Sequence, residues 1–152
     1  MATKEEFIRV MTEGYSTKGD FITLGGPVFE GAVFQEAQIK APLRTFNRHG
    51  LIAGATGSGK TKTLQGIAEK LSDKGVPVLL MDIKGDLSGI ARAGVENDKL
   101  KERQTKLGIP WTPAAYPVEL MSLSEEKGAR MRATVTEFGP VLFSKILDLN
   151  DT

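Results

Sequence analysis

Residues 50–61 read GLIAGATGSGKT, and this stretch carries the clearest structural signal in the chain. Residues 54–61 match the pattern G-x-x-x-x-G-K-[ST] at every fixed position. The residues of this match are Gly54, Ala55, Thr56, Gly57, Ser58, Gly59, Lys60 and Thr61. An apolar run over 50–55 leads into the pattern, and apolar residues at helical spacing follow it. This order predicts a strand, a phosphate-binding loop and a helix.

The three glycines of the loop have a physical purpose. We expect Gly54, Gly57 and Gly59 to let the backbone adopt positive φ and to bring consecutive N–H groups close to phosphate oxygens. The N-terminus of the helix that begins near Lys60 adds further N–H donors and a positive dipole end. Together these groups predict a site for the α- and β-phosphates of a nucleotide.

The side chains that follow the glycines predict the remaining contacts. Lys60 supplies a point charge to the β- and γ-phosphates, and the Thr61 hydroxyl is a hard oxygen ligand for Mg²⁺. Lys62 completes the expected nucleotide-binding set, 54–62. We therefore expect ATP and Mg²⁺ as cofactors, Lys60 in the catalytic role and Thr61 at the metal. The alternative is a glycine-rich turn that binds nothing.

The chain around the loop has an alternating organisation. Leu64, Ile67, Ala68 and Leu71 have helical spacing, and residues 72–75 are expected to end that helix. A second apolar run follows at 76–81, and a third strand is expected at 116–123. A strand, a crossover helix and a strand predict parallel pairing in a right-handed βαβ unit.

The remaining segments predict a small amino-terminal part and further helices. A short amphipathic helix is expected at 3–12, and a small antiparallel or hairpin β element at 21–43. The expected domains are therefore 1–45 and 46–152. Other helices are expected at 86–93 and 97–108, and a last one carries Phe138, Val141, Leu142, Ile146 and Leu149, with Pro140 in its first turn.

The composition excludes several classes of protein. The chain has 152 residues with no Cys and one His, which excludes disulfide frameworks, thiolate zinc sites and thiol nucleophiles. The net charge of +1 gives no molecule-wide basic field that would indicate nucleic acid. The sequence shows neither a signal peptide nor an apolar run of membrane-spanning length, so we expect a cytoplasmic protein without membrane contact.

Two carboxylates follow the second apolar run. Asp82 ends the stretch VLLMD in the manner of a Walker B strand and is a candidate for holding Mg²⁺ through water. Ile83 comes next, however, so no general base stands beside it. Asp86 is a candidate for orienting the site, or alternatively caps the helix expected at 86–93.

Three weaker candidates have simpler explanations beside the functional ones. Residues 47–49 (NRH) either approach the nucleotide or form a solvated loop. Lys127, Arg130 and Arg132 either meet phosphate or DNA, or belong to a charged surface. Trp111, between Pro110 and Pro113, either stacks on a base or packs against the domain.

Three stretches resemble the HerA-like ATPases of the YjgR type, within the HerA/FtsK superfamily, and specifically their amino-terminal part. These stretches are HGLIAGATGSGKTKTLQ, LLMDIKGDLSGIA and RMRATVTEFGPVLFSKILDLNDT. The phosphate loop is common to many families, whereas DIKGDLSG and RATVTEFGP discriminate between them. The resemblance extends over about residues 20–152.

The resemblance implies an α/β fold, namely a RecA-like P-loop NTPase with a parallel sheet and flanking helices, incomplete at its C-terminus and preceded by the small β element. It implies a ring-forming homo-oligomer for the full-length protein, with relatives that translocate duplex DNA. Asp82 then falls on the second strand rather than on the Walker B strand. The Walker B Asp-Glu pair, the sensor strand and the arginine finger are expected after Thr152.

Three functions remain open at this point. The first is the ATP-binding part of a HerA-like ATPase that couples hydrolysis to conformational change and DNA translocation. The second is a small-molecule kinase in which the DIKGD stretch holds an acceptor hydroxyl. The third is a nucleotide-binding module that does not hydrolyse ATP.

Overall fold

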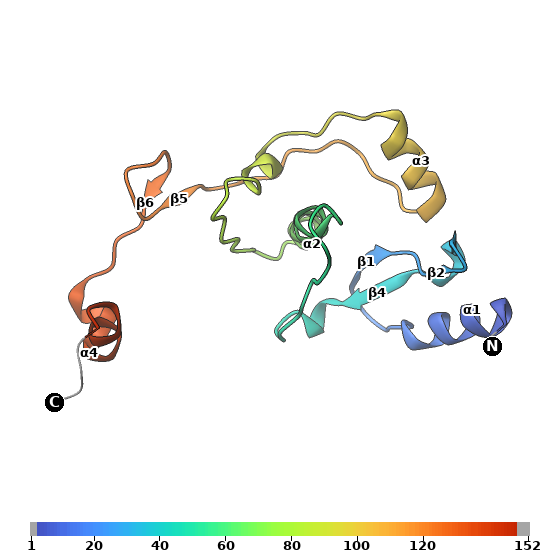
Figure 1. Ribbon diagram of the computed structural model, residues 1–152, viewed down its shortest axis with the longest axis horizontal. Coiled ribbons are helices and arrows are strands. Elements are labelled where there is room, and N and C mark those ends of the chain that lie inside the picture. Colours follow the sequence, from blue (N-terminus) through green and yellow to red (C-terminus); the bar gives the residue numbers. More distant parts are fainter. Residues whose placement is uncertain (1–2, 149–152) are drawn as a thin grey trace. The chain divides into compact units, whose positions relative to one another are not determined.

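The computed structural model describes residues 3–148 and divides the chain into two compact units, Met1–Pro117 and Val118–Thr152. The first unit carries α1 to α3, β1 to β4 and three short 3-10 turns, and the second carries β5, β6 and α4 (Figure 1). Within the described residues, no helix combines the length and the apolar character needed to cross a membrane.

The small amino-terminal β element is antiparallel, as the sequence predicts. Strand β1 (Phe21–Gly25) pairs with β4 (Ile39–Pro42), and β2 (Val28–Phe29) pairs with β3 (Ala32–Val33). Positive φ at Glu30 (49°) and Gly31 (80°) makes the two-residue turn between β2 and β3. The short 3-10 turns η1 (Gln35–Ala37) and η2 (Leu43–Thr45) flank β4.

The first helix packs on this β element through aromatic side chains. Helix α1 (Lys4–Gly14) confirms the amphipathic helix predicted at 3–12, and the Thr3 side chain caps its N-terminus. The Phe7 ring stacks on Phe29 at 4.8 Å and meets the edge of Phe34 at 6.1 Å. This cluster fixes α1 beside the β element by apolar burial.

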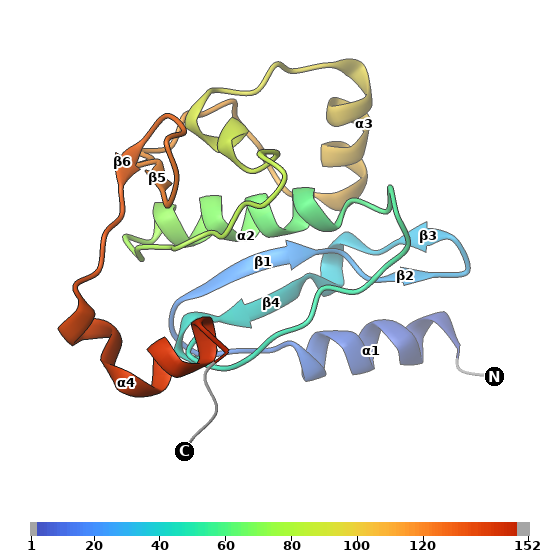
Figure 2. The ribbon, with the colours of Figure 1, turned by 60° about the vertical axis from the view of Figure 1, so that its left-hand side comes forward.

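Helix α2 (Lys60–Asp73) follows the glycine-rich loop directly, as predicted. Its buried residues are Gln65, Ala68 and Leu71, and it contacts β1, whose Ile22 is also buried. Figure 2 shows α2 along one side of the β1–β4 ribbon, with α1 on the other side. The core of this unit therefore forms where α2 and the β element meet.

The end of α2 confirms the predicted stop at residues 72–75. Gly75 has a φ of 73°, its N–H bonds the Ser72 carbonyl at 2.8 Å, and the Val76 N–H bonds the Leu71 carbonyl at 3.0 Å. These two bonds form a Schellman motif, in which a glycine takes the left-handed conformation that other residues reach only at a cost.

Two further elements of the first unit follow the sequence in part. Helix α3 (Asp98–Leu107) confirms the helix predicted at 97–108, with Asn97 as its cap and Gly108 after its end. The helix predicted at 86–93 is a single 3-10 turn, η3 (Ser88–Ala91). A hydrogen bond of 3.2 Å from Tyr116 Oη to Asp73 ties the chain after α3 to the end of α2.

The predicted parallel sheet is not found within residues 3–148. The segments 50–55 and 76–81 contain no strand, and the parallel pairing of the predicted βαβ unit does not form. Most of their side chains are exposed to solvent, with Leu51 88% exposed and Leu79 79% exposed. A parallel strand needs hydrogen-bonded partners beside it and apolar cover on both faces, and neither segment has them.

The second unit contains a short parallel pair and a kinked helix. Strand β5 (Met121–Ser122) keeps only the end of the strand predicted at 116–123, and it pairs with β6 (Ala129–Arg130). Helix α4 (Val135–Ile146) begins with a capping box between Thr134 and Glu137. Gly139 is not helical, so the helical turns resume at Pro140, as predicted.

The apolar residues that the sequence predicts for the last helix can be compared with their exposure in α4. Val141, Leu142 and Ile146 are exposed within this unit. Leu149, the last residue of the predicted apolar series, lies outside the described residues.

Two glycines of the α2 region provide a matched test of its local geometry. Gly66→Ala should raise the free energy of unfolding by about 0.5–1 kcal/mol, because Gly66 is a helical position with open space at its Cβ. Gly75→Ala should lower it by about 1–2 kcal/mol, because alanine disfavours positive φ. Urea denaturation checks both, and shifts of the same sign would contradict the helix end described here.

Candidate phosphate-binding loop

The loop between residues 54 and 60 adopts the backbone that its glycines were expected to permit, although one glycine serves a different purpose. Gly57 and Gly59 have φ values of 79° and 93°, in the left-handed region. Gly54 does not have positive φ. A Cβ there would lie 2.6 Å from the Ser58 Oγ, so a larger residue at position 54 would require the Ser58 side chain to move.

The Lys60 side chain folds back over this loop. Its ammonium donates hydrogen bonds of 2.8 Å to the carbonyls of both Gly54 and Ala55. The Ser58 N–H closes the turn by bonding the Ala55 carbonyl at 3.2 Å. A positive charge is therefore held against the loop at the point where α2 begins.

The N-terminus of α2 leaves its first N–H donors without side-chain partners. Gly59 is the N-cap residue and makes no capping hydrogen bond, and the first turn of α2 carries no acidic side chain. The Thr63 N–H is the first that bonds within the helix, to the Gly59 carbonyl at 2.9 Å. The N–H groups of residues 60–62 thus point out of the helix end, where the macrodipole favours an anion.

The two side chains after Lys60 differ in their surroundings. Thr61 is half-buried in the first turn of α2. The Lys62 ammonium donates a hydrogen bond of 2.9 Å to Gln65 Oε1, so it lies along the helix and away from the loop. Lys62 can therefore reach a phosphate through its N–H, but its charge is engaged elsewhere.

Asp82 organises a turn. Its Oδ1 accepts the Gly85 N–H at 2.8 Å, and its Oδ2 accepts the Leu87 N–H at 2.9 Å. Both carboxylate oxygens are therefore used by the backbone of the DIKGDL stretch. The arrangement gives Asp82 a structural task, which agrees with the inference from the resemblance that it is not the Walker B acid.

The pKa of Asp82 reflects these hydrogen bonds. Partial loss of water would by itself raise the pKa, but N–H donation by Leu87 and Gly85 favours the charged form, and the net effect lowers the pKa below its ordinary value. The ionised carboxylate is thus the form that holds the turn together.

Gln65 joins this turn to the helix that carries the loop. Its side chain is only 6% exposed, and its Nε2 donates to the carbonyls of Asp86 at 3.0 Å and Leu87 at 3.5 Å. No motif in the sequence assigns a role to Gln65. The available signal was a polar residue three positions before Ala68 on the apolar face of α2, because a buried amide requires partners.

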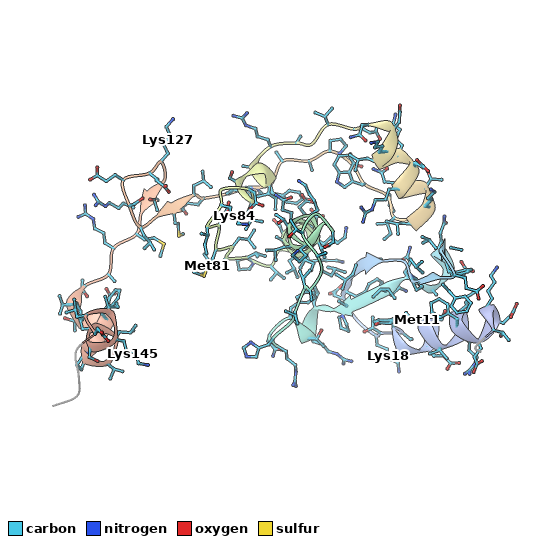
Figure 3. The ribbon with its side chains drawn as sticks, viewed as in Figure 1. Met11, Lys18, Met81, Lys84, Lys127 and Lys145 are labelled. Carbon is cyan, nitrogen blue, oxygen red and sulfur yellow. The ribbon has the colours of Figure 1, made fainter. Side chains whose placement is uncertain are left out.

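The weaker sequence candidates occupy surface positions. Residues 47–49 are exposed after η2, and Trp111 packs against the backbone of Gly94, where an added Cβ would lie 3.1 Å from the indole. Lys127, Arg130 and Arg132 are exposed in the second unit, where Figure 3 labels Lys127 on the loop between β5 and β6. Asp86 does not cap η3, whose N-cap residue is Leu87.

The fold and the loop define a mixed α/β protein. A glycine-rich loop, whose carbonyls accept hydrogen bonds from Lys60, precedes a helix. The model of the family described as helicase HerA-like C-terminal matches residues 30–152. The chain belongs to this family. No curated protein and no solved structure matches it.

Asp82→Asn tests the Asp82 clamp, meaning the two hydrogen bonds from Gly85 and Leu87 to the Asp82 carboxylate, through the pH dependence of stability. A carboxyl whose pKa is lowered by folding contributes stability above its ordinary pKa and loses that contribution as the pH falls through the folded value. The variant should therefore unfold at lower urea than the wild type at about pH 6, and the difference should shrink at about pH 3. A difference that is independent of pH would contradict the clamp.

Proposed function

We propose that residues 54–62 bind Mg·ATP and that the chain is the nucleotide-binding part of a HerA-type ATPase. The observation that carries the proposal is the Lys60 ammonium held at 2.8 Å from two loop carbonyls beside the N–H groups that begin α2. The negative charge of a phosphate attracts the Lys60 ammonium more strongly than a neutral carbonyl oxygen does. We therefore expect Lys60 to exchange its two carbonyl partners for the β- and γ-phosphates when a nucleotide binds.

The proposed metal would be held by Thr61 together with the nucleotide. No group of three or more His, Cys, Asp or Glu side chains gathers within residues 3–148. Thr61 nevertheless fits Mg²⁺, because this ion takes few protein ligands and completes its shell with phosphates and water. Held by Thr61 and the nucleotide, the ion would supply positive charge against the phosphate oxygens.

The finer features of the proposal have separate supports. The YjgR-type resemblance supports a RecA-like ATPase that acts as a ring, and duplex DNA as a partner is drawn from that resemblance alone. The family model that matches is described as a helicase, which agrees with a role on nucleic acid. The net charge of the chain does not support a DNA partner, since 20 Lys and Arg residues are balanced by 19 Asp and Glu residues.

The alternatives predict different products from ATP. A kinase would transfer phosphate to an acceptor hydroxyl, whereas a module that only binds would leave ATP intact. We expect the 152-residue chain to bind ATP with little turnover, because the sequence lacks an Asp-Glu pair after an apolar strand. Lys60-dependent turnover by this chain would instead favour a complete hydrolase.

Lys60→Ala tests the binding proposal by calorimetric titration with Mg·ATP. The variant should bind about 10- to 100-fold more weakly, because a hydrogen bond to a charged group contributes about 1.5–3 kcal/mol. Lys74→Ala is the matched control, since Lys74 lies at the other end of α2 and pairs with Asp20 at 3.7 Å. Equal affinities for wild type and Lys60→Ala would overturn the proposal.

A further inference from the structure

The Gln65 amide is fixed in one orientation by its surroundings. Its Oε1 faces the Lys62 ammonium at 2.9 Å, and its Nε2 faces the Asp86 and Leu87 carbonyls. A reversed amide would place its oxygen against carbonyls and its nitrogen against a cation, which are both repulsive contacts. The bonds therefore define a connection with a direction, from Lys62 through Gln65 to the backbone of the turn.

The turn that Gln65 holds is itself ordered. Asp82 binds the N–H groups of Gly85 and Leu87, the Ser88 hydroxyl donates to the Gly85 carbonyl at 3.2 Å, and Leu87 is buried. Figure 3 labels Met81, directly before this turn, and Lys84 within it. The turn is closed by its own hydrogen bonds. A bond that holds the Asp86 carbonyl in place therefore also fixes the backbone position from which the Asp86 side chain extends.

Helical geometry places this connection on the side of α2 that carries Thr61. Thr61 and Gln65 are four residues apart in α2, so their side chains are neighbours on one face with Cβ atoms about 5–6 Å apart. The turn is bonded to Gln65 and therefore lies beside that face. Its Asp86 carboxylate is exposed, and within residues 3–148 it neither caps η3 nor joins an ion pair.

We propose that Gln65 is a positioning residue that holds the turn of residues 82–88 on the Thr61 face of α2, so that the Asp86 carboxylate meets the water shell of a magnesium–nucleotide complex at the phosphate loop. The inference rests on the proposed function and deepens it. Mg²⁺ bound to phosphates retains several waters, and a carboxylate beside the ion accepts hydrogen bonds from them. Groups that bind the ligands of a metal in this way commonly change its affinity by 10- to 100-fold.

Two isosteric variants separate positioning from general stability. Gln65→Glu keeps the acceptor for Lys62 but removes the donor to the Asp86 carbonyl. Asp86→Asn keeps the backbone that Gln65 binds but removes the exposed charge. Gln38→Ala is the control, because Gln38 donates its amide to the Gly108 carbonyl at 3.3 Å and has no hydrogen bond to the turn.

The measurement is the affinity of the full chain for ATP, by calorimetry, with Mg²⁺ and with a chelator. Gln65→Glu and Asp86→Asn should each weaken binding about tenfold with Mg²⁺ and leave binding without Mg²⁺ unchanged. The double variant should lose no more than either single one, because Gln65 acts through Asp86. Gln38→Ala should match the wild type in both conditions.

Each other outcome has a distinct meaning. Equal losses with and without Mg²⁺, additive losses in the double variant, or no loss at all would overturn the role of Gln65 while leaving nucleotide binding intact. A wild-type chain that binds ATP in neither condition would overturn the proposed function, and the inference with it.

Discussion

The packing of α2 against β1 is the contact on which the rest of the first unit depends. One face of α2 buries Ala68 and Leu71, and α2 contacts β1, whose Ile22 is also buried, so this packing sets the position of the helix. The N-terminus of the same helix follows the glycine-rich loop of residues 54–59, and the end of the helix is closed by Gly75. Because a helix is stiff, fixing its buried face also fixes where the loop N–H groups point. The candidate site is therefore placed by apolar contacts that lie outside it.

Gln65, a polar residue on that buried face, connects α2 to a second segment, the turn of residues 82–88. Gln65 satisfies two carbonyls of the 82–88 turn and is itself satisfied by Lys62. Leaving a buried polar group unpaired costs about 1–3 kcal/mol, so the turn and the helix hold each other in register. Asp82 closes the turn from within. The helix that follows GATGSGKT and the DIKGDL stretch are thus joined by the hydrogen bonds of Gln65.

The sequence predicted the parts of this arrangement that depend on neighbouring residues. Helix α2 starts at Lys60 and stops before Gly75 because glycine conformation and apolar spacing are local signals, and Pro140 begins a helix for the same reason. Strand pairing is not local. Leu51 and Leu79 belong to apolar runs typical of buried strands, yet both side chains are exposed to solvent. A parallel sheet needs neighbouring strands, and an apolar run does not specify which strands those are. The sequence does not indicate the role of Gln65, because its hydrogen bonds to the turn exist only where the turn meets α2.

We propose that the N–H groups of the loop and the first turn of α2 receive a nucleotide phosphate. Amide hydrogen exchange over residues 57–62, measured with and without Mg·ATP, tests this proposal at the binding groups themselves. Exchange should slow at these positions when Mg·ATP is added, because the exposed donors become hydrogen-bonded to phosphate oxygens. Unchanged exchange at these positions under saturating Mg·ATP would contradict it.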